Sequence, residues 1–145
     1  MGRFEFWEPP LLVDGQPCEY GWVVKGINNF RLERETDIGF GTYIQAQEGV
    51  FLGRGVQIGG NCCIYSVDSI SGKHGPVDIK AGACVGAGSV VLPNVTIGED
   101  AIVGAGTVVL GDIPAGYTVW EDKKWQCRYK VRDNILNIRP WFWRE

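Results

Sequence analysis

The only histidine of the chain, His74, lies in a short polar stretch, residues 68–78 (DSISGKHGPVD). An imidazole titrates near neutral pH, so it can take a proton from a hydroxyl or an amine while that atom attacks an electrophile. Asp68 supplies a carboxylate in the same stretch, and a carboxylate beside the ring would fix its tautomer. His74 and Asp68 are therefore the residues of this stretch whose types suit acid–base chemistry. An exposed loop histidine without a chemical role is the alternative.

This stretch interrupts a repeat of six residues that runs through most of the chain. Downstream, the residues that recur at this spacing are Ile79, Val85, Val91, Ile97, Val103 and Val109. Upstream, they are Leu32, Ile38, Ile44, Val50, Val56 and Cys62. A fixed period is the first guide to architecture, and an α-helix cannot keep every sixth residue on one face.

Short flat strands joined by glycine corners do keep this period, if three of them close into a triangular coil that stacks on the next. Residues 32–67 and 79–114 would each form two coils of 18 residues. The sequence therefore predicts an all-β fold, a left-handed parallel β-helix of about four coils over residues 32–114 with an inserted loop at 68–78. An irregular loop on a rigid frame is a common place for binding and catalysis.

The tract VGAGSVVLPNVTIGEDAIVGAGTVVLGDIPAG resembles the hexapeptide-repeat acyltransferases, and IYSVDSISGKHGPVDI is similar to small bacterial sugar acetyltransferases of surface-polysaccharide biosynthesis. The resemblance implies transfer of an acetyl group from acetyl-coenzyme A to a hydroxyl or amine of a sugar, which is expected to be nucleotide-linked. It also implies a histidine base, here His74, and a homotrimer with its sites between neighbouring prisms. The sequence around His74 departs from the family's Asp-His…His-Pro tract.

In the family, backbone N–H groups at the coil corners bind the pantetheine part of the cofactor and the thioester oxygen. Carried over to this chain, the resemblance implies that Gly86, Ala87, Gly104 and Ala105 bind acetyl-coenzyme A, the acyl donor. An N–H at such a corner would also stabilise the negative oxygen that develops during acyl transfer. The alternative is that these residues only turn corners, which every coil requires.

Three further residues complete the predicted site. Lys123 and Lys124 follow the last coil, where the family often places basic residues against the phosphates of coenzyme A; a solvated helix face is the alternative, since VWEDKKW replaces the family's Gly-x-Pro-Ala-Lys tract. Asn61 or a serine of the loop would bind and orient the acceptor if His74 is not the base.

The two ends of the chain lack the repeat. Residues 1–31 are expected to cap the first coil, with a strand that includes Phe4, Phe6 and Trp7 and is ended by Pro9 and Pro10. Residues 115–145 form a C-terminal extension, with a helix predicted over 121–138 and an aromatic tail (WFW, 141–143) that needs a partner surface. A non-catalytic trimeric scaffold that docks a partner through this tail is therefore the alternative function.

Composition narrows the function classes. A formal net charge of −3 with no basic stripe argues against nucleic acid as the partner, and the sequence has no apolar run long enough to span a membrane. One histidine per chain argues against the β-helix carbonic anhydrases, whose zinc needs three, and no metal site is predicted. The five cysteines are expected to be structural and reduced, and a cytoplasmic location is expected.

Overall fold

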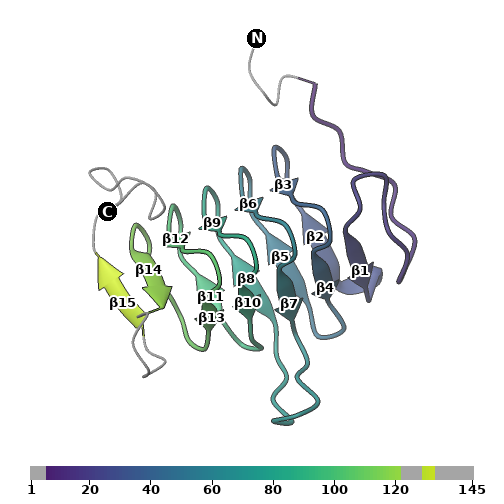
Figure 1. Ribbon diagram of the computed structural model, residues 1–145. Coiled ribbons are helices and arrows are strands. Elements are labelled where there is room, and N and C mark those ends of the chain that lie inside the picture. Colours follow the sequence, from purple (N-terminus) through teal and green to yellow (C-terminus); the bar gives the residue numbers. More distant parts are fainter. Residues whose placement is uncertain (1–5, 122–128, 133–145) are drawn as a thin grey trace.

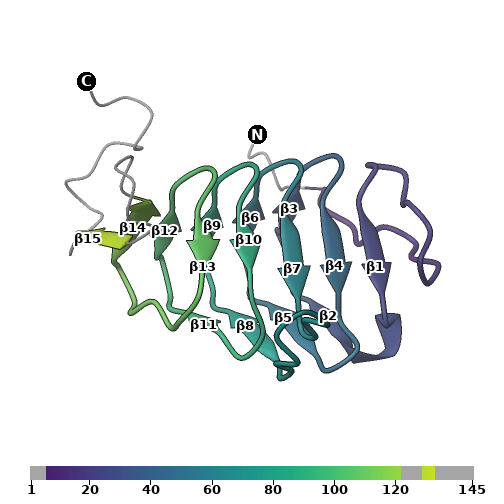
Figure 2. The same ribbon diagram turned by 60° about the horizontal axis from the view of Figure 1, so that its bottom comes forward.

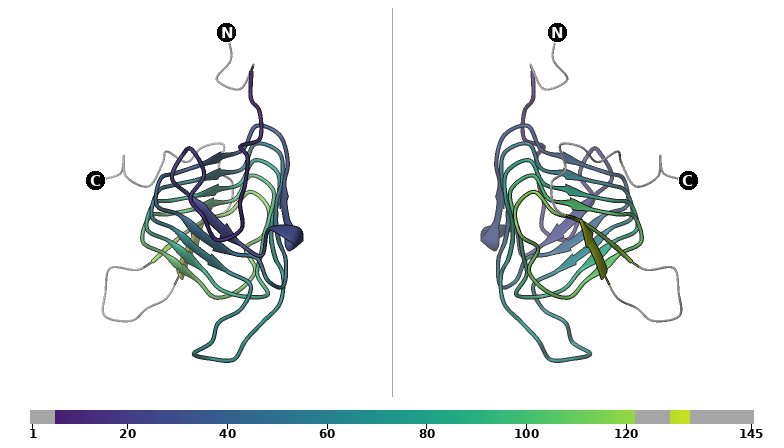
Figure 3. Two further views of the ribbon diagram at one scale, coloured as in Figure 1. Left: turned by 90° about the vertical axis from the view of Figure 1, so that its right-hand side faces the viewer. Right: turned by 90° about the vertical axis from the view of Figure 1, so that its left-hand side faces the viewer.

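The structure is a computed structural model, and it describes residues 6–121 and 129–132. The described chain winds into a triangular solenoid whose three sides are β-sheets, A, B and C (Figures 1, 2 and 3). Every pair of stacked strands in the coils is parallel. The predicted all-β, left-handed parallel β-helix is confirmed. No helix of the described residues is long and apolar enough to cross a membrane.

The strands are short, and each sheet takes one strand from each coil. Sheet A contains β1 (Val23–Lys25), β4 (Tyr43–Gln45), β7 (Cys63–Tyr65), β10 (Val90–Val91) and β13 (Val108–Val109). Sheet B contains β2 (Phe30–Leu32), β5 (Val50–Leu52), β8 (Val77–Ile79) and β11 (Thr96–Ile97). Sheet C contains β3 (Asp37–Ile38), β6 (Gln57–Ile58), β9 (Cys84–Val85), β12 (Ile102–Val103), β14 (Thr118–Glu121) and β15 (Tyr129–Arg132). A 3₁₀ turn, η1 (Ile27–Asn29), precedes β2.

Sheet A has five strands, so the solenoid has about five coils where the sequence predicted about four. The extra coil begins at β1, inside the stretch that was expected to be a cap. The six-residue count did not include this coil because Val24, which pairs with Ile44 of the next coil, lies eight residues before Leu32 instead of six.

The core consists of aliphatic side chains that stack from coil to coil. In sheet A the stacked residues are Ile44, Ile64, Val91 and Val109. In sheet B they are Leu32, Leu52, Ile79 and Ile97, and in sheet C Ile38, Ile58, Val85 and Val103. All of these except the partly buried Leu32 are buried. Removal of this apolar surface from water is the main term that holds the solenoid together.

The stacking corrects the predicted register of the second coil. The six-residue count aligned Val50 and Val56 with the aliphatic stack, but the residues that pair with Leu32 and Ile38 are Leu52 and Ile58. Val50 and Val56 are also buried, because they are the smaller inward residues two positions earlier. The coil from Leu32 to Leu52 therefore has 20 residues, not 18.

Every departure from the six-residue spacing between Leu32 and Val109 falls at the same edge of the prism, the turns between sheets A and B, here called the A/B edge. The spacing across this edge is eight residues from Ile44 to Leu52 and fifteen from Ile64 to Ile79. Across the other two edges it is six in these coils. The longest insertion is the loop that projects from the bottom of the solenoid in Figure 1. Only the A/B edge therefore carries irregular structure in this part of the chain.

A row of small polar side chains lies inside the opposite edge of sheet A, here called the C/A edge. Its members are Thr42, Cys62, Ser89 and Thr107, one from each of four successive coils, and all are buried. The Ser89 hydroxyl donates to the Gly104 carbonyl at 3.0 Å and accepts the Thr107 N–H at 3.3 Å. The Thr107 hydroxyl itself has no hydrogen-bond partner among the described residues. The hydrogen bonds of this row join neighbouring coils as far as Thr107.

At each end of the solenoid, one sheet is extended by chain that runs antiparallel to its terminal strand. At the start, the Gly15 N–H donates to the Val24 carbonyl at 2.8 Å, and at the end β15 pairs antiparallel with β14. Such pairing covers sheet edges that would otherwise template aggregation. The predicted helix over 121–138 is wrong at residues 129–132, which form β15; its other residues after 121, and the aromatic tail, lie outside the described residues.

The N-terminal prediction also needs a correction. Phe6 and Trp7 form no strand; instead the Trp7 indole N–H donates to the Thr36 carbonyl at 2.8 Å and ties this segment to the prism. The four described cysteines are free, and burial raises the pKa of the Cys62 thiol above its ordinary value.

Candidate functional site

His74 lies on a hairpin that the A/B edge inserts between β7 and β8. Val67 and His74 form an antiparallel bridge, and the Asp68 N–H donates to the Lys73 carbonyl at 2.8 Å. Because β8 begins at Val77, the insertion comprises residues 66–76, two residues earlier at each end than predicted. The hairpin has a paired stem, so its backbone fixes the direction in which each stem side chain points.

The carboxylate that meets His74 is Glu48, from the preceding coil. His74 Nδ1 lies 3.0 Å from Glu48 Oε1, and the two side chains are 67% and 43% exposed. With Nδ1 as donor to Glu48, the ring is held in the tautomer whose Nε2 accepts a proton. This is the arrangement that a general base requires.

Two partly buried hydrogen bonds hold the backbone of Glu48 in place. The Ser66 hydroxyl, on the first stem strand of the hairpin, donates to Gln45 Oε1 at 2.7 Å and accepts the Glu48 N–H at 2.9 Å. Ser66 is fully buried. One side chain thus joins the hairpin that carries His74 to the turn that carries its carboxylate.

The structure does not bring Asp68, the predicted partner, to His74. Its carboxylate accepts the Ser71 hydroxyl at 2.7 Å and the Ile70 N–H at 3.1 Å. These two hydrogen bonds lower the pKa of Asp68, the hydroxyl being the main cause. Asp68 therefore shapes the tip of the hairpin, and Glu48 occupies the position that the sequence analysis assigned to it.

Asn61 lies at the other edge of sheet A. It precedes β7, whereas the hairpin follows β7, so the two lie at opposite ends of one strand. Its N–H donates to the Phe40 carbonyl at 3.0 Å, and its backbone has a φ of 56°. A methyl group on Gly41 would lie within 3.2 Å of the Asn61 carboxamide carbon, so Asn61 packs closely over that glycine. Within one chain Asn61 cannot orient a ligand at His74.

The predicted cofactor residues also lie on the C/A edge, on successive coils. At Gly86, a side chain would collide with the Ala105 backbone nitrogen of the next coil, so this glycine is required for the stacking of coils. The N–H groups of Ala87 and Ala105 donate no backbone hydrogen bond within the described chain, whereas the Gly106 N–H bonds to the Ala87 carbonyl at 2.9 Å. Ala87 and Ala105 therefore offer free donors, and Lys123 and Lys124 lie outside the described residues.

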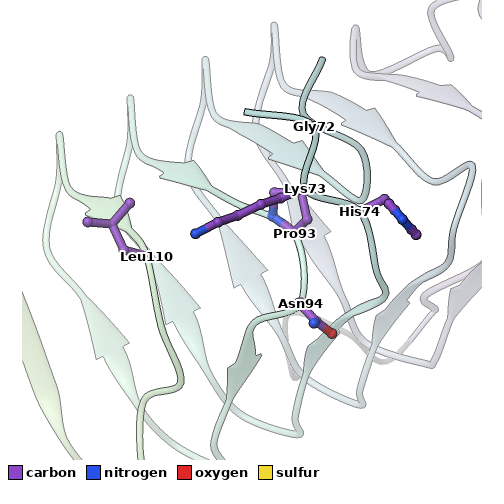
Figure 4. Close-up of a pocket in the computed structure, with 6 residues that line it drawn as sticks. All are labelled: Gly72, Lys73, His74, Pro93, Asn94 and Leu110. Atoms are coloured by element: carbon purple, nitrogen blue, oxygen red, sulfur yellow. The ribbon is translucent and has the colours of Figure 1, made fainter. Parts of the chain in front are cut away.

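A shallow pocket of about 400 Å³ lies beside the hairpin on the A/B edge (Figure 4). It is lined by Gly72, Lys73, His74, Pro93, Asn94 and Leu110. In Figure 4 the His74 ring points away from Leu110, and the Lys73 side chain extends toward Leu110. Adjacent residues of an extended strand point to opposite faces, which accounts for this difference.

Sequence reasoning missed Glu48 because it lies 26 residues from His74, on a different coil. The contact depends on the two extra residues of the preceding turn, which displace the register. The spacing of eight between Ile44 and Leu52 was the available signal, since it marks that turn as irregular.

Three comparisons bear on the family. The family model described as bacterial transferase hexapeptide (six repeats) matches residues 76–111. The search of curated proteins gave no significant match. Among solved structures, a hexapeptide-repeat acetyltransferase from Vibrio cholerae in complex with acetyl-coenzyme A aligns with a TM-score of 0.69 and 18% identity, covering 80% of this chain and 66% of that one.

The descriptions of two further solved structures name a sugar. The N-acyltransferase AntD from Bacillus cereus, in complex with dTDP-4-amino-4,6-dideoxyglucose and coenzyme A, has a TM-score of 0.65 and 22% identity, covering 78% of this chain and 65% of that one. A maltose O-acetyltransferase from Clostridium difficile 630 has a TM-score of 0.59 and 23% identity, covering 80% and 60%. The resemblance to hexapeptide-repeat transferases is thereby confirmed: the chain has their fold, and residues 76–111 match their repeat model.

Proposed function

We propose that the chain is an acyltransferase that moves an acetyl group from acetyl-coenzyme A to a hydroxyl or amine of a sugar, nucleotide-linked and used for surface polysaccharide. The observation that carries this proposal is the His74–Glu48 contact of 3.0 Å on the one irregular edge of the prism. The chain offers a positioned proton acceptor where its regular frame is broken, which is where chemistry is expected.

In this proposal, His74 Nε2 takes the proton from the acceptor hydroxyl or amine as that atom attacks the thioester carbonyl. Glu48 accepts the hydrogen bond from Nδ1–H throughout and stabilises the imidazolium that forms. Acetyl-coenzyme A supplies the acetyl group: its thioester C–S bond breaks, and the departing coenzyme A thiolate takes the proton back from His74 Nε2. The free N–H groups of Ala87 and Ala105 are suited to the amide and carbonyl oxygens of the donor, and one of them to the negative oxygen that develops.

The two halves of this site lie too far apart within one chain. The donor groups are on the C/A edge and His74 is on the A/B edge, roughly 20 Å apart across six residues of extended chain. A ring of three chains would place the A/B edge of one copy against the C/A edge of the next. We therefore propose a homotrimer in which each site is shared by two copies, and separately propose a cytoplasmic location, as expected from the sequence.

Turnover tests the catalytic part of the proposal. Release of free coenzyme A is measured with a panel of sugar and nucleotide-sugar acceptors for wild type, His74→Ala, Glu48→Gln and the control Glu99→Gln. General base catalysis contributes roughly 10²- to 10⁴-fold, so His74→Ala should lose that much in kcat with little change in acetyl-coenzyme A affinity. Full activity of His74→Ala on every accepted sugar would refute the role of the base.

Two substitutions distinguish the hydrogen bond that Glu48 accepts from the negative charge that it carries. Glu48→Gln keeps an oxygen that can accept the Nδ1 proton, whereas Glu48→Ala removes it. We expect the alanine variant to lose more kcat than the glutamine variant and both to shift the pH profile of kcat, with the profile of Glu99→Gln unchanged. A purely structural role would lower activity without shifting that profile.

Mixing two inactive variants tests whether the site is shared. His74→Ala lacks the base, and Ala87→Trp blocks the donor edge with a large ring. If each site joins two chains, refolding the variants together restores activity at roughly a quarter of the interfaces, because a quarter pair two intact halves. No recovery in mixed oligomers would place the whole site in one chain.

A further inference from the structure

The pocket beside the hairpin carries a positive charge that the proposed reaction does not use. Lys73 projects from the face of the stem opposite to His74, because the Val67–His74 bridge fixes the orientation of both residues. The paired backbone of the stem, in which the Asp68 N–H donates to the Lys73 carbonyl at 2.8 Å, sets the direction in which the Lys73 side chain leaves the chain. The stem therefore directs the Lys73 ammonium group toward the pocket.

Lys73 forms no salt bridge among the described residues, although its charge is a minor cause of the lowered pKa of Asp68. Two other described lysines form salt bridges: Lys25 Nζ lies 3.4 Å from Asp14 and Lys80 Nζ lies 2.7 Å from Asp78. The nearest acid in sequence, Asp68, is engaged with the tip of its own hairpin. No aspartate or glutamate lines the pocket.

The remaining lining suits a ligand with a charged end and a less polar body. Asn94 contributes a carboxamide, and its position is fixed because it packs against Gly75, where an added side chain would come within 2.8 Å of it. Pro93 is buried, and the Leu110 side chain, 63% exposed, forms the far rim. A lysine ammonium and an amide facing an apolar rim are complementary to a carboxylate or phosphate carried on a larger molecule.

We propose that this pocket binds an anionic group, a carboxylate or phosphate, of one of the two substrates, held by Lys73 with Asn94 as the second donor. The inference deepens the proposed acyl transfer, on which it rests for the identity of the molecule that carries the anion. The group belongs either to an acidic or nucleotide-linked sugar or to the phosphates of coenzyme A. The presence of the anion site itself is independent of the reaction.

Inorganic pyrophosphate is the probe that does not depend on the proposed function. Its binding to the full chain is measured by calorimetry at low salt for wild type, Lys73→Met, Lys73→Arg and the control Lys80→Met. Because Lys73→Met removes a charge-assisted contact, its affinity for pyrophosphate should fall about tenfold. The affinities of Lys73→Arg and Lys80→Met should stay close to that of wild type. Equal binding by Lys73→Met and wild type, or no binding to wild type at millimolar pyrophosphate, overturns the proposal.

The same variants then identify the source of the anion. If it is the donor, Lys73→Met weakens acetyl-coenzyme A about tenfold and leaves acetyl-pantetheine, which lacks the phosphates, unchanged. If it is the acceptor, Lys73→Met raises KM for UDP-linked or carboxylated sugars and leaves acetyl-coenzyme A and neutral sugars unchanged. No effect in either arm refutes the substrate assignment. Failure of wild type to bind acetyl-coenzyme A would instead refute the proposed function, and the pyrophosphate result would stand by itself.

Discussion

Two hydroxyl groups of the polar row inside the C/A edge should respond in opposite directions when they are removed. Ser89 is fully buried; its hydroxyl donates to the Gly104 carbonyl at 3.0 Å and accepts the Thr107 N–H at 3.3 Å. Ser89→Ala leaves both backbone groups without this partner in a region closed to water. A buried polar group that loses its partner costs about 1–3 kcal/mol, so we expect the free energy of unfolding to fall by about 2 kcal/mol.

Thr107→Val makes the reverse change on the next coil. The Thr107 hydroxyl is buried and has no partner among the described residues, and valine has nearly the same shape. An uncompensated buried hydroxyl costs about 1–3 kcal/mol in protein mutational data. Its removal should therefore raise the free energy of unfolding by about 1 kcal/mol, after allowance for imperfect packing of the new methyl group.

Urea unfolding followed by circular dichroism measures both effects. All variants are compared at one protein concentration, because assembly would make stability depend on concentration. For a chain of this size the thermal midpoint should move about 2–4 °C per kcal/mol, downward for Ser89→Ala and upward for Thr107→Val. Ser69→Ala, in the exposed hairpin, is the control with no expected change. Equal signs for the two buried variants would refute the account of this row.

Three other perturbations follow from the same structure. Gly75→Ala places a side chain within 2.8 Å of Asn94 at a φ of 151°, so it should distort the hairpin and lower kcat while the far-UV spectrum of the solenoid is kept. Ser66→Ala removes the hydroxyl that accepts the Glu48 N–H, so kcat should fall severalfold with acetyl-coenzyme A affinity unchanged; unchanged kcat would exclude that support. Burial is the main cause that raises the pKa of Cys62 above 9.0. Its contribution to stability is complete below that pH and lost as pH rises further, so wild type should lose stability above pH 9.0 more steeply than Cys62→Ser in alkaline denaturation curves.

The repeat in the sequence was enough to predict the β-helix, because backbone geometry alone imposes a six-residue period on a triangular coil. It was not enough to predict the register of the early coils. Val50 and Val56 continue the count from Ile44, yet they belong to the smaller inward position, and both positions accept aliphatic residues. A shift of the register by two residues therefore hardly changes the pattern of aliphatic residues in the sequence.

The candidate site was predicted in part for the same reason. The inserted loop and His74 stand out from a regular frame, whereas a contact such as His74–Glu48 depends on which coils are neighbours and on the length of the turn before. Asp68 was the nearest acid in sequence, but its own hairpin supplies a hydroxyl and an N–H that bind it more locally. Local hydrogen bonds of this kind compete with long-range ones and are hard to see in a pattern.

The most direct test of the central claim is the thermal midpoint of the purified protein with and without acetyl-coenzyme A, for wild type and His74→Ala together. A ligand at a hundred times its Kd stabilises the folded state by about 2.7 kcal/mol, so the account predicts a rise of several degrees in both proteins. Turnover should then be lost only in His74→Ala. No rise in either protein at millimolar acetyl-coenzyme A would contradict the account and favour a non-catalytic scaffold.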